Sequence, residues 1–147
     1  MSLQCVLFQN VGVYPIRDSS HAKDILTKLK EWGVTYAGFQ KTHLNLTHPE
    51  CFTKVQRDFS KHSPNTKVQM HSNRTTHRES LYQPGGLMNI VRATYSNKRP
   101  ITTTDPTASI QHTRIKCEHS TLSVFNVYVP PPSTGPTAMH TQVVNTM

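Results

Sequence analysis

A strand–helix–strand pattern near the start of the chain constrains the fold more than any other feature of the sequence. Residues 3–8 are almost continuously apolar, which is typical of a strand buried on both faces. Residues 22–32 carry apolar side chains at helical spacing, and Gly33 is suited to end that helix. A second apolar run, residues 34–39, predicts the next strand. Two strands joined by a helix form a βαβ unit with parallel strands, so the sequence predicts an α/β fold.

The later segments predict a second helix and several more strands. The sequence Thr-His-Pro-Glu at 47–50 resembles a capping box, and Phe52, Val55 and Phe59 predict a helix that buries these side chains and ends near Lys61. Strands are expected at residues 67–71 and 87–91 and in a hairpin of residues 110–117 and 121–129. Loops are expected at residues 73–83 and 102–107. Residues 130–136 should break the sheet, and residues 137–147 should begin a helix.

Polar residues follow the first two predicted strands. Asn10 follows the first strand, and Lys41 lies just beyond the second. Because parallel neighbours end at the same edge of a sheet, we expect these two side chains to lie side by side, where α/β sheets usually present their chemistry. An Asn next to a carboxylate would suit Mg²⁺, which prefers oxygen ligands. An ammonium at that position repels a divalent ion, at about 4 kcal/mol per charge pair at ~4 Å and an effective dielectric of ~20. Lys41 therefore either contacts a phosphate or is simply solvated.

The chain of 147 residues is strongly basic, with 16 Lys and Arg residues against 8 acidic residues and a formal charge of +8. This surplus favours an anionic partner such as nucleic acid, a phosphorylated ligand or an anionic membrane; of these we expect nucleic acid, with DNA as one candidate, and no membrane. A basic stretch at residues 54–78 includes Arg74 and Arg78, which are candidate phosphate contacts, and Tyr82 and Tyr95 could stack on bases. The alternative is an ordinary solvated face with the two tyrosines in the core.

Other features of the sequence narrow the kinds of functional site that the chain could contain and the cellular compartment in which it would fold. Three widely spaced cysteines without a C-x-x-C pair argue against a disulfide framework and indicate a reducing compartment. The first residues lack the features of a signal peptide, and no apolar run is long enough to span a membrane. We therefore expect an intracellular location, with the nucleus as one candidate. The nine histidines match no standard zinc spacing, and no nucleophile elbow, Walker loop or dinucleotide motif occurs.

Several short motifs occur in an order that resembles a known superfamily. They are Phe8-Gln-Asn10 with Gly12, Phe39-Gln-Lys-Thr-His43, Tyr82-Gln-Pro-Gly-Gly86, Thr104-Asp-Pro106, Asn126-Val-Tyr-Val-Pro130, and Gly135-Pro-Thr with Gln142. Together they resemble the endonuclease/exonuclease/phosphatase superfamily with its DNase I-like fold, and most of all the endonuclease domains of retrotransposons. The resemblance implies two sheets packed face to face with helices outside, and a Mg²⁺-dependent phosphodiesterase. It also implies Asn10 as a metal-binding and catalytic residue and Tyr128 as a second catalytic residue.

The departures from the superfamily pattern are as informative as the matches. Lys41 stands where the family has its metal-binding Glu, and Ala108-Ser109-Ile110 replaces a Gly-Arg-Trp sequence. The matched motifs cover about the first half of the family's domain and not its later Asp-x-Asn and Asp-His motifs. The resemblance therefore implies one truncated domain over residues 1–147, a partial α/β sandwich with a βαβ start, two flanking helices and a C-terminal hairpin. Such a half domain would leave one sheet face uncovered.

Three hypotheses on function follow from these observations. The first is a degenerate fragment of a metal-dependent endonuclease of retroelement type, which is inactive alone and binds no Mg²⁺, although its intact relatives would. The second is a basic module that binds nucleic acid without catalysis, with an affinity that falls steeply with salt. The third is a remnant that never folds stably, which would show no cooperative thermal transition.

Overall fold

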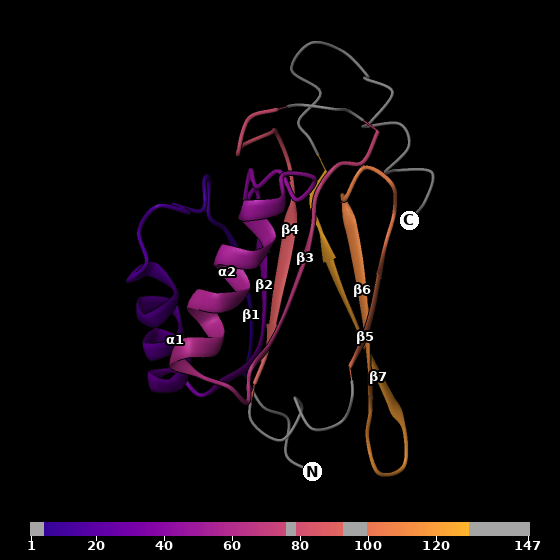
Figure 1. Cartoon of the computed structure of the whole chain (residues 1–147). Coiled ribbons are helices and arrows are strands. Elements are labelled where there is room, and N and C mark those ends of the chain that lie inside the picture. Colours follow the sequence, from indigo (N-terminus) through magenta and orange to yellow (C-terminus); the bar gives the residue numbers. More distant parts are fainter. Residues whose placement is uncertain (1–4, 76–78, 93–99, 130–147) are drawn as a thin grey trace.

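Two β-sheets lie face to face, and both helices cover the outer face of the larger sheet (Figure 1). The structure is a computed structural model and describes residues 5–75, 79–92 and 100–129. The four-stranded sheet has the order β1-β2-β4-β3, formed by Cys5–Asn10, Val34–Gln40, Leu87–Val91 and Lys67–His71 in that order. The three-stranded sheet has the order β5-β6-β7, formed by Ile101–Thr104, Ile110–Lys116 and Thr121–Val127. The helices are α1, His21–Glu31, and α2, Pro49–His62.

The predicted βαβ unit is present, with β1 parallel to β2 and α1 between them in sequence. The apolar residues of α1 recur at helical spacing, so Ala22, Leu26 and Leu29 are all buried against the sheet side of the helix. Gly33 adopts a left-handed conformation, with φ +65°, directly after the helix. That conformation is easily reached only by glycine, so the helix ends there as the sequence predicts.

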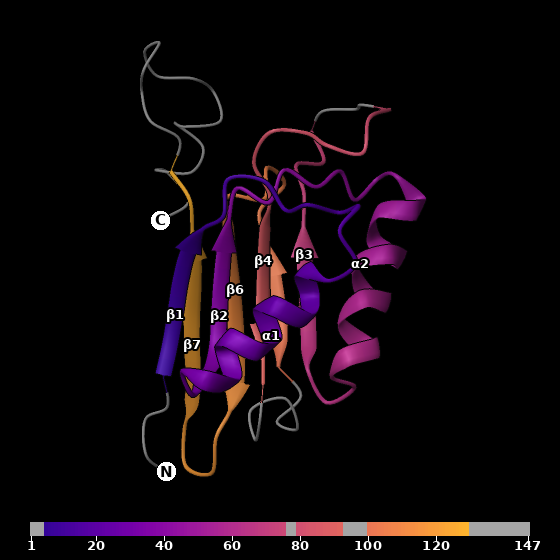
Figure 2. The same ribbon diagram turned by 90° about the vertical axis from the view of Figure 1, so that its left-hand side faces the viewer.

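Strand β1 differs from the prediction that its residues are buried on both faces. It lies at the edge of the four-stranded sheet (Figure 2), and five of its six residues are exposed. Val6 and Phe8 are 37% and 46% exposed, because no described strand pairs with the outer edge of β1. An apolar run alone does not distinguish a central strand from an edge strand, since that depends on which segments pair beside it.

The expected capping box is not formed, and helix α2 begins one residue later than this motif predicts. Its N-cap is His48, without a capping side-chain hydrogen bond, while the Thr47 hydroxyl donates to Asn45 Oδ1 at 2.6 Å. Pro49 lies in the first turn as predicted. Phe52 is 46% exposed, so its predicted burial is wrong, and the smaller side chain of Cys51 is buried instead. The helix is rotated so that Cys51, Val55 and Phe59 form its buried stripe.

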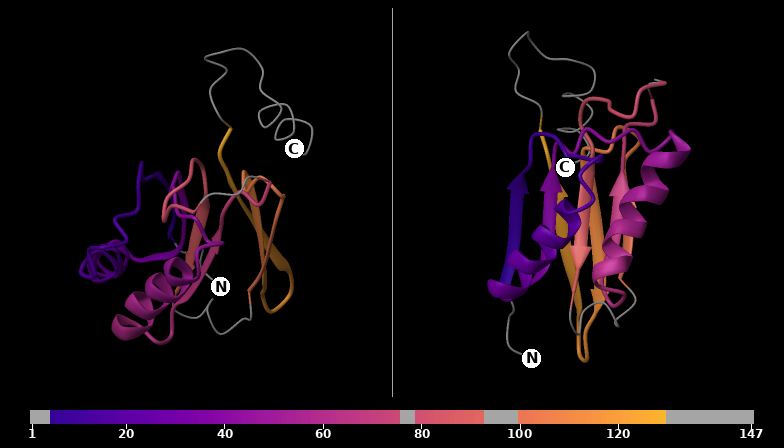
Figure 3. Two further views of the ribbon diagram at one scale, coloured as in Figure 1. Left: turned by 45° about the horizontal axis from the view of Figure 1, so that its top comes forward. Right: turned by 60° about the vertical axis from the view of Figure 1, so that its left-hand side comes forward.

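The two helices lie along one face of the four-stranded sheet (Figure 3), and the main hydrophobic core includes residues from both of these layers. It includes Leu29 from α1, Phe59 from α2 and Ile90 from β4, each no more than 1% exposed. A smaller cluster of Tyr36, Val91, Ile115 and Val124 lies between the two sheets. The apolar interior is therefore largest on the helix side, and polar side chains fill much of the space between the sheets.

The second sheet contains the predicted hairpin, β6 and β7, closed by Cys117 N donating to Ser120 O at 2.8 Å. Residues 102–107 are expected to form a loop, but residues 102–104 belong to strand β5, because their backbone pairs with β6. The outward face of this sheet carries Phe125, which is 55% exposed, and no described helix covers it. The predicted break at 130–136 and helix at 137–147 lie outside the described residues. Neither described helix is long and apolar enough to cross a membrane.

Candidate functional site

The ends of β1 and β2 meet at one edge of the larger sheet, as the sequence predicts for parallel neighbours. Their register aligns Asn10 with Gln40, and Val11 N donates to Gln40 O at 3.0 Å just beyond the last aligned pair. Lys41 directly follows Gln40, the last residue of β2. We call this region the strand-end edge and define it by Asn10, Gln40, Lys41 and Tyr128.

Asn10 lies at the strand-end edge with an exposed side chain. Its amide oxygen, Oδ1, accepts a hydrogen bond from Gly12 N at 3.0 Å. This contact is the usual way in which an Asn stabilises the turn that follows it. The loop after β1 therefore already engages one of the two lone pairs of the oxygen that would ligate a metal ion.

Lys41 and Tyr128 come together across the two sheets. Lys41 Nζ lies 5.3 Å from the centroid of the Tyr128 ring, within the range of a cation–π interaction. Tyr128 directly follows β7, and its backbone N donates to Ser109 O at 2.9 Å, which holds the ring close to the end of β2. Lys41 itself has a left-handed backbone, with φ 58°. The ammonium group thus occupies the space in front of the one aromatic residue predicted for the site.

Asn126 links the two sheets directly beneath the strand-end edge. It is fully buried, and its Nδ2 lies within hydrogen-bonding distance of Phe39 O, Met88 O and Gln111 Oε1, at 3.2, 3.2 and 3.1 Å. Its Oδ1 accepts from Gln40 Nε2 at 2.8 Å. Gly38 leaves room for this side chain, since a Cβ there would lie 2.9 Å from Asn126 Cγ. The Asn126 amide thus makes hydrogen bonds to residues of β2, β4 and β6.

The polar contacts continue from Asn126 to His71 in β3. Gln111 Nε2 lies 3.2 Å from Gln69 O and 3.0 Å from His71 Nδ1. Burial, and to a lesser degree the nearby Arg74, lowers the pKa of His71, while Asp105 raises it. None of the site residues predicted from the sequence belongs to this network. The signal for it was the presence of polar residues, Gln111 and Asn126, at the inward positions of the hairpin strands, where apolar residues are usual.

The two predicted phosphate-contact arginines are placed differently by the structure. Arg74 is exposed in the loop after β3, where its backbone N donates to Pro106 O at 2.9 Å. It lines a cavity of about 260 Å³ together with Phe52 and Met70. Arg78 and Tyr95 lie outside the described residues. Tyr82 is half-buried and accepts a hydrogen bond from Ile16 N at 3.4 Å, so it packs into the fold rather than presenting a free ring for stacking.

The residues at the strand-end edge do not fit a magnesium ion. Mg²⁺ requires oxygen ligands, usually including a carboxylate. Here Lys41 supplies an ammonium, and the Asn10 oxygen is bonded to Gly12 N. Asp105 is the carboxylate of the Thr-Asp-Pro motif, but its Oδ1 accepts from the backbone N of Ser109 and Ile110, and its Oδ2 accepts from Thr107 N. In the described part of the chain, no three His, Cys, Asp or Glu side chains gather to hold a metal.

The two facing sheets, the helices on the outer face of the larger sheet and the polar strand ends define an α/β fold of the DNase I-like class. Solved structures with this fold include an AP endonuclease from Archaeoglobus fulgidus, with a TM-score of 0.52 and 18% identity over 88% of this chain and 42% of that protein. An AP endonuclease from Leishmania major has a TM-score of 0.58 and 13% identity over 86% and 40%.

An endonuclease/exonuclease/phosphatase family protein from Leptotrichia buccalis also has a TM-score of 0.58, with 13% identity over 99% of this chain and 62% of that protein. The chain therefore spans less than two thirds of the length of each of these three proteins. No protein-family model and no curated protein matches the sequence. At these identities the likeness establishes the fold, and the predicted DNase I-like α/β fold class is confirmed.

Proposed function

We propose that this chain is a degenerate module of a metal-dependent phosphodiesterase, of the retroelement endonuclease type, that no longer hydrolyses nucleic acid. The single observation that carries the proposal is the position of Lys41, whose ammonium lies over the Tyr128 ring at the strand-end edge. The motifs quoted above support the retroelement origin, and they correspond to the first half of the family's domain. On that basis we also propose that residues 1–147 belong to a single domain.

The loss of hydrolysis follows from the chemistry of the strand-end edge. A phosphodiesterase of this type relies on a metal ion to polarise the phosphate and stabilise the leaving oxygen. Replacing a carboxylate by an ammonium turns an attraction for the ion into a repulsion of similar size, and the swing is about 8 kcal/mol as an upper estimate for an open site. Among the described residues, no group of three or more His, Cys, Asp or Glu side chains offers an alternative metal site.

A plasmid-nicking assay in Mg²⁺ and in Mn²⁺ tests this proposal. We expect no nicking above the level of an Asn10→Ala variant purified in the same way, because Asn10 is the one candidate metal ligand of the family that is retained at the edge. Cleavage by the wild-type chain that Asn10→Ala abolishes would refute the proposal. A Lys41→Glu variant tests the cause directly, and we expect it to bind Mg²⁺ more tightly than the wild type in isothermal titration calorimetry.

A second candidate function is binding of nucleic acid without catalysis. It is favoured by the exposed Arg74 and by the ammonium of Lys41 at the strand-end edge, in a chain with a net charge of +8. Binding of this kind depends on contacts to phosphates, so it requires no divalent ion. Its affinity falls as the salt concentration rises, because the release of counterions from the nucleic acid then contributes less free energy.

This candidate is tested by measuring affinity for DNA and RNA in EDTA at several salt concentrations. Lys41→Gln, Arg74→Gln and Arg78→Gln should each weaken binding and reduce the slope of log K against log salt by about 1. Arg114→Gln, an equal loss of charge at an exposed position of β6, is the matched control. Binding that is indifferent to salt, or equal losses in the control, would contradict this function.

A further inference from the structure

A preformed groove lies between the loop that follows β1 and the first half of α2, on the helix side of the larger sheet. It has a volume of about 640 Å³, within the range of about 300–1,000 Å³ that is usual for small-molecule sites. The lining residues that matter here are Ile16, Arg17, Glu50, Lys54, Arg57 and Leu81. None of them belongs to the strand-end edge.

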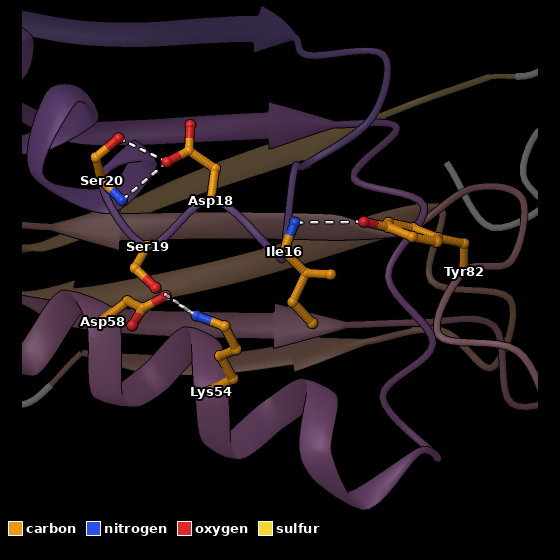
Figure 4. A network of polar contacts seen from close by, with 7 residues as sticks. All are labelled: Ile16, Asp18, Ser19, Ser20, Lys54, Asp58 and Tyr82. Carbon is orange, nitrogen blue, oxygen red and sulfur yellow. Dashed lines mark hydrogen bonds and ion pairs between the residues drawn. The ribbon is translucent and has the colours of Figure 1, made fainter.

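Hydrogen bonds hold both walls of this groove in place (Figure 4). Ile16 N donates to the Tyr82 hydroxyl at 3.4 Å and ties the loop to the segment that carries Leu81. Lys54 Nζ donates to Ser19 Oγ at 2.9 Å and to Asp58 Oδ2 at 2.8 Å, which ties the loop to α2. A ligand would therefore meet a site whose shape is already set, which lowers the entropic cost of binding.

The charge balance of the groove favours an oxyanion. The charge of Lys54 is compensated by its ion pair with Asp58. Arg17 and Arg57 are exposed and make no ion pair with any carboxylate among the described residues, and Glu50 is the one acidic residue in the lining. A guanidinium group binds phosphate through two parallel hydrogen bonds, so two free arginines on one groove suit a phosphate group better than a simple halide or a neutral ligand.

The remaining lining residues suit the other parts of a nucleotide. Leu81 is partly buried against the main core and lines the groove, so it offers an apolar contact to a flat ring, whereas Ile16 is only 3% exposed and adds little accessible surface. The Glu50 carboxylate can only accept hydrogen bonds while it is ionised, which suits the exocyclic amino group of a base or a ribose hydroxyl. Cations, an apolar wall and one acceptor in the same groove match phosphate, base and a donor group, respectively.

We propose that this groove binds a nucleoside monophosphate unit, either as a free nucleotide or as the phosphorylated end of a single strand. Arg17 and Arg57 bind the phosphate, Leu81 contacts the base, and Glu50 accepts a hydrogen bond from an amino or hydroxyl group. This site goes beyond the function proposed above, because neither Asn10 nor Lys41 takes part in it.

Isothermal titration calorimetry of the full chain with AMP, adenosine and inorganic phosphate tests the proposal. We expect AMP to bind more tightly than either adenosine or phosphate alone. Arg17→Gln and Arg57→Gln should each weaken AMP binding about tenfold, which is the effect of losing one charged hydrogen bond. Arg114→Gln removes the same charge from the other sheet and should leave AMP binding unchanged. Because both groove arginines are exposed, each variant should keep the thermal transition of the wild type.

Two further comparisons separate the sources and the role of Glu50. A tetranucleotide with a 5′-phosphate is compared with AMP: comparable binding assigns the site to strand ends, and binding of AMP alone assigns it to free nucleotides. Glu50→Gln should reduce the preference for AMP over IMP, which lacks the amino group. The proposal is wrong if phosphate binds as tightly as AMP or if the arginine variants bind AMP like the wild type. Lys41→Gln should not change AMP binding, so this result is independent of the nicking and salt experiments.

Discussion

At the scale of single residues, the unusual backbone conformations cluster in loops next to strand ends. Lys41, His43 and Ala108 have left-handed conformations, with φ of 58°, 56° and 55°. Such a conformation costs an L-residue about 1–2 kcal/mol, so the surrounding contacts must enforce it. Two backbone hydrogen bonds hold the segment that contains Lys41 and His43. In these bonds His43 N donates to Gly85 O at 2.8 Å, and Thr42 N donates to Gly86 O at 3.4 Å. The Pro-Gly-Gly segment thus positions the Lys41 loop that defines the strand-end edge.

Ala108 offers a clean test of this backbone strain. It lies in the turn held by Asp105, is 2% exposed and contributes only a methyl group. We expect Ala108→Gly to raise the free energy of unfolding by about 0.5 kcal/mol, because the relief of about 1–2 kcal/mol exceeds the entropy cost of about 0.5–1 kcal/mol. Ala22→Gly, inside α1, should instead destabilise the chain by about 1 kcal/mol or more. Urea titration measures both changes, and an Ala108→Gly variant less stable than wild type would contradict the argument.

Asn126 is the residue whose loss should affect stability most. Asn126→Ala would leave the Gln40 amide and Gln111 Oε1 without this partner, and it would remove the contacts to Phe39 O and Met88 O, which keep the backbone pairing of β2 with β4. We expect a loss of about 2–4 kcal/mol in the free energy of unfolding, since each buried unsatisfied group costs about 1–3 kcal/mol. Asn10→Ala, an amide exposed to solvent, is the control and should cost less than about 1 kcal/mol. Equal losses for the two variants in urea titrations would show that the inter-sheet contacts do not matter.

At the scale of elements, β1 presents an open strand edge. The strand Cys5–Asn10 has no charged residue, and no described strand pairs with its outer edge. Unpaired edge strands of this kind are prone to associate with other chains, and natural proteins usually protect them with charges or prolines. Val6, which is 37% exposed, adds apolar surface to the same edge.

We expect Val6→Lys to reduce concentration-dependent self-association, because a charge on an edge strand opposes further strand pairing. Light scattering across a range of protein concentrations measures the effect. Ser60→Lys, at an exposed position of α2, adds the same charge away from any strand edge and is the matched control. If both variants reduce association equally, net charge alone is responsible and the edge is not.

At the scale of the whole molecule, a continuous polar network joins the two sheets and contains a titratable group. Asn126 donates to Gln111 Oε1 and Gln111 Nε2 donates to Gln69 O, so the orientation of the Gln111 amide is set on both sides. The same Nε2 lies 3.0 Å from His71 Nδ1, which must then accept and remain unprotonated. Burial lowers the pKa of His71 most, and the nearby Arg74 lowers it further. Asp105 raises this pKa by a smaller amount. Burial and the neighbouring Lys41 lower the pKa of His43 as well.

These pKa shifts predict a chain that is less stable in mild acid. The ordinary pKa of both histidines is 6.5, and it is lower in the folded chain. As the pH falls below about 6.5, the unfolded state therefore binds more protons, and the free energy of unfolding declines until the folded pKa values are passed. Far-UV circular dichroism melts from pH 8 to 5 measure this, and His71→Gln should make the decline shallower. Trp32, which is 56% exposed, makes fluorescence a poor probe.

The same melts decide whether the chain is a stable fold or an unfolded remnant. Because the polar network and the Tyr36–Val124 cluster join the sheets, we expect one cooperative transition at pH 7.5. A sloping signal without a transition would support the remnant hypothesis and would remove the structural basis of both proposals.

The sequence by itself determined the local elements and their order. Helical spacing and Gly33 were sufficient for α1, and alternation and turn residues were sufficient for β3 and for the β6–β7 hairpin, because these signals act over a few residues. The strand-end positions of Asn10 and Lys41 also followed from sequence, since parallel strands joined by a helix end at one edge.

Only the tertiary structure decided which residues meet across the molecule. It made β1 an edge strand, placed Lys41 over Tyr128 and buried Asn126 against Phe39 O, 87 positions away in the chain. It also assembled the groove of Arg17 and Arg57 from two separate segments. The physical reason is that periodicity and turn chemistry report only near neighbours, whereas burial and pairing depend on how separate segments pack together.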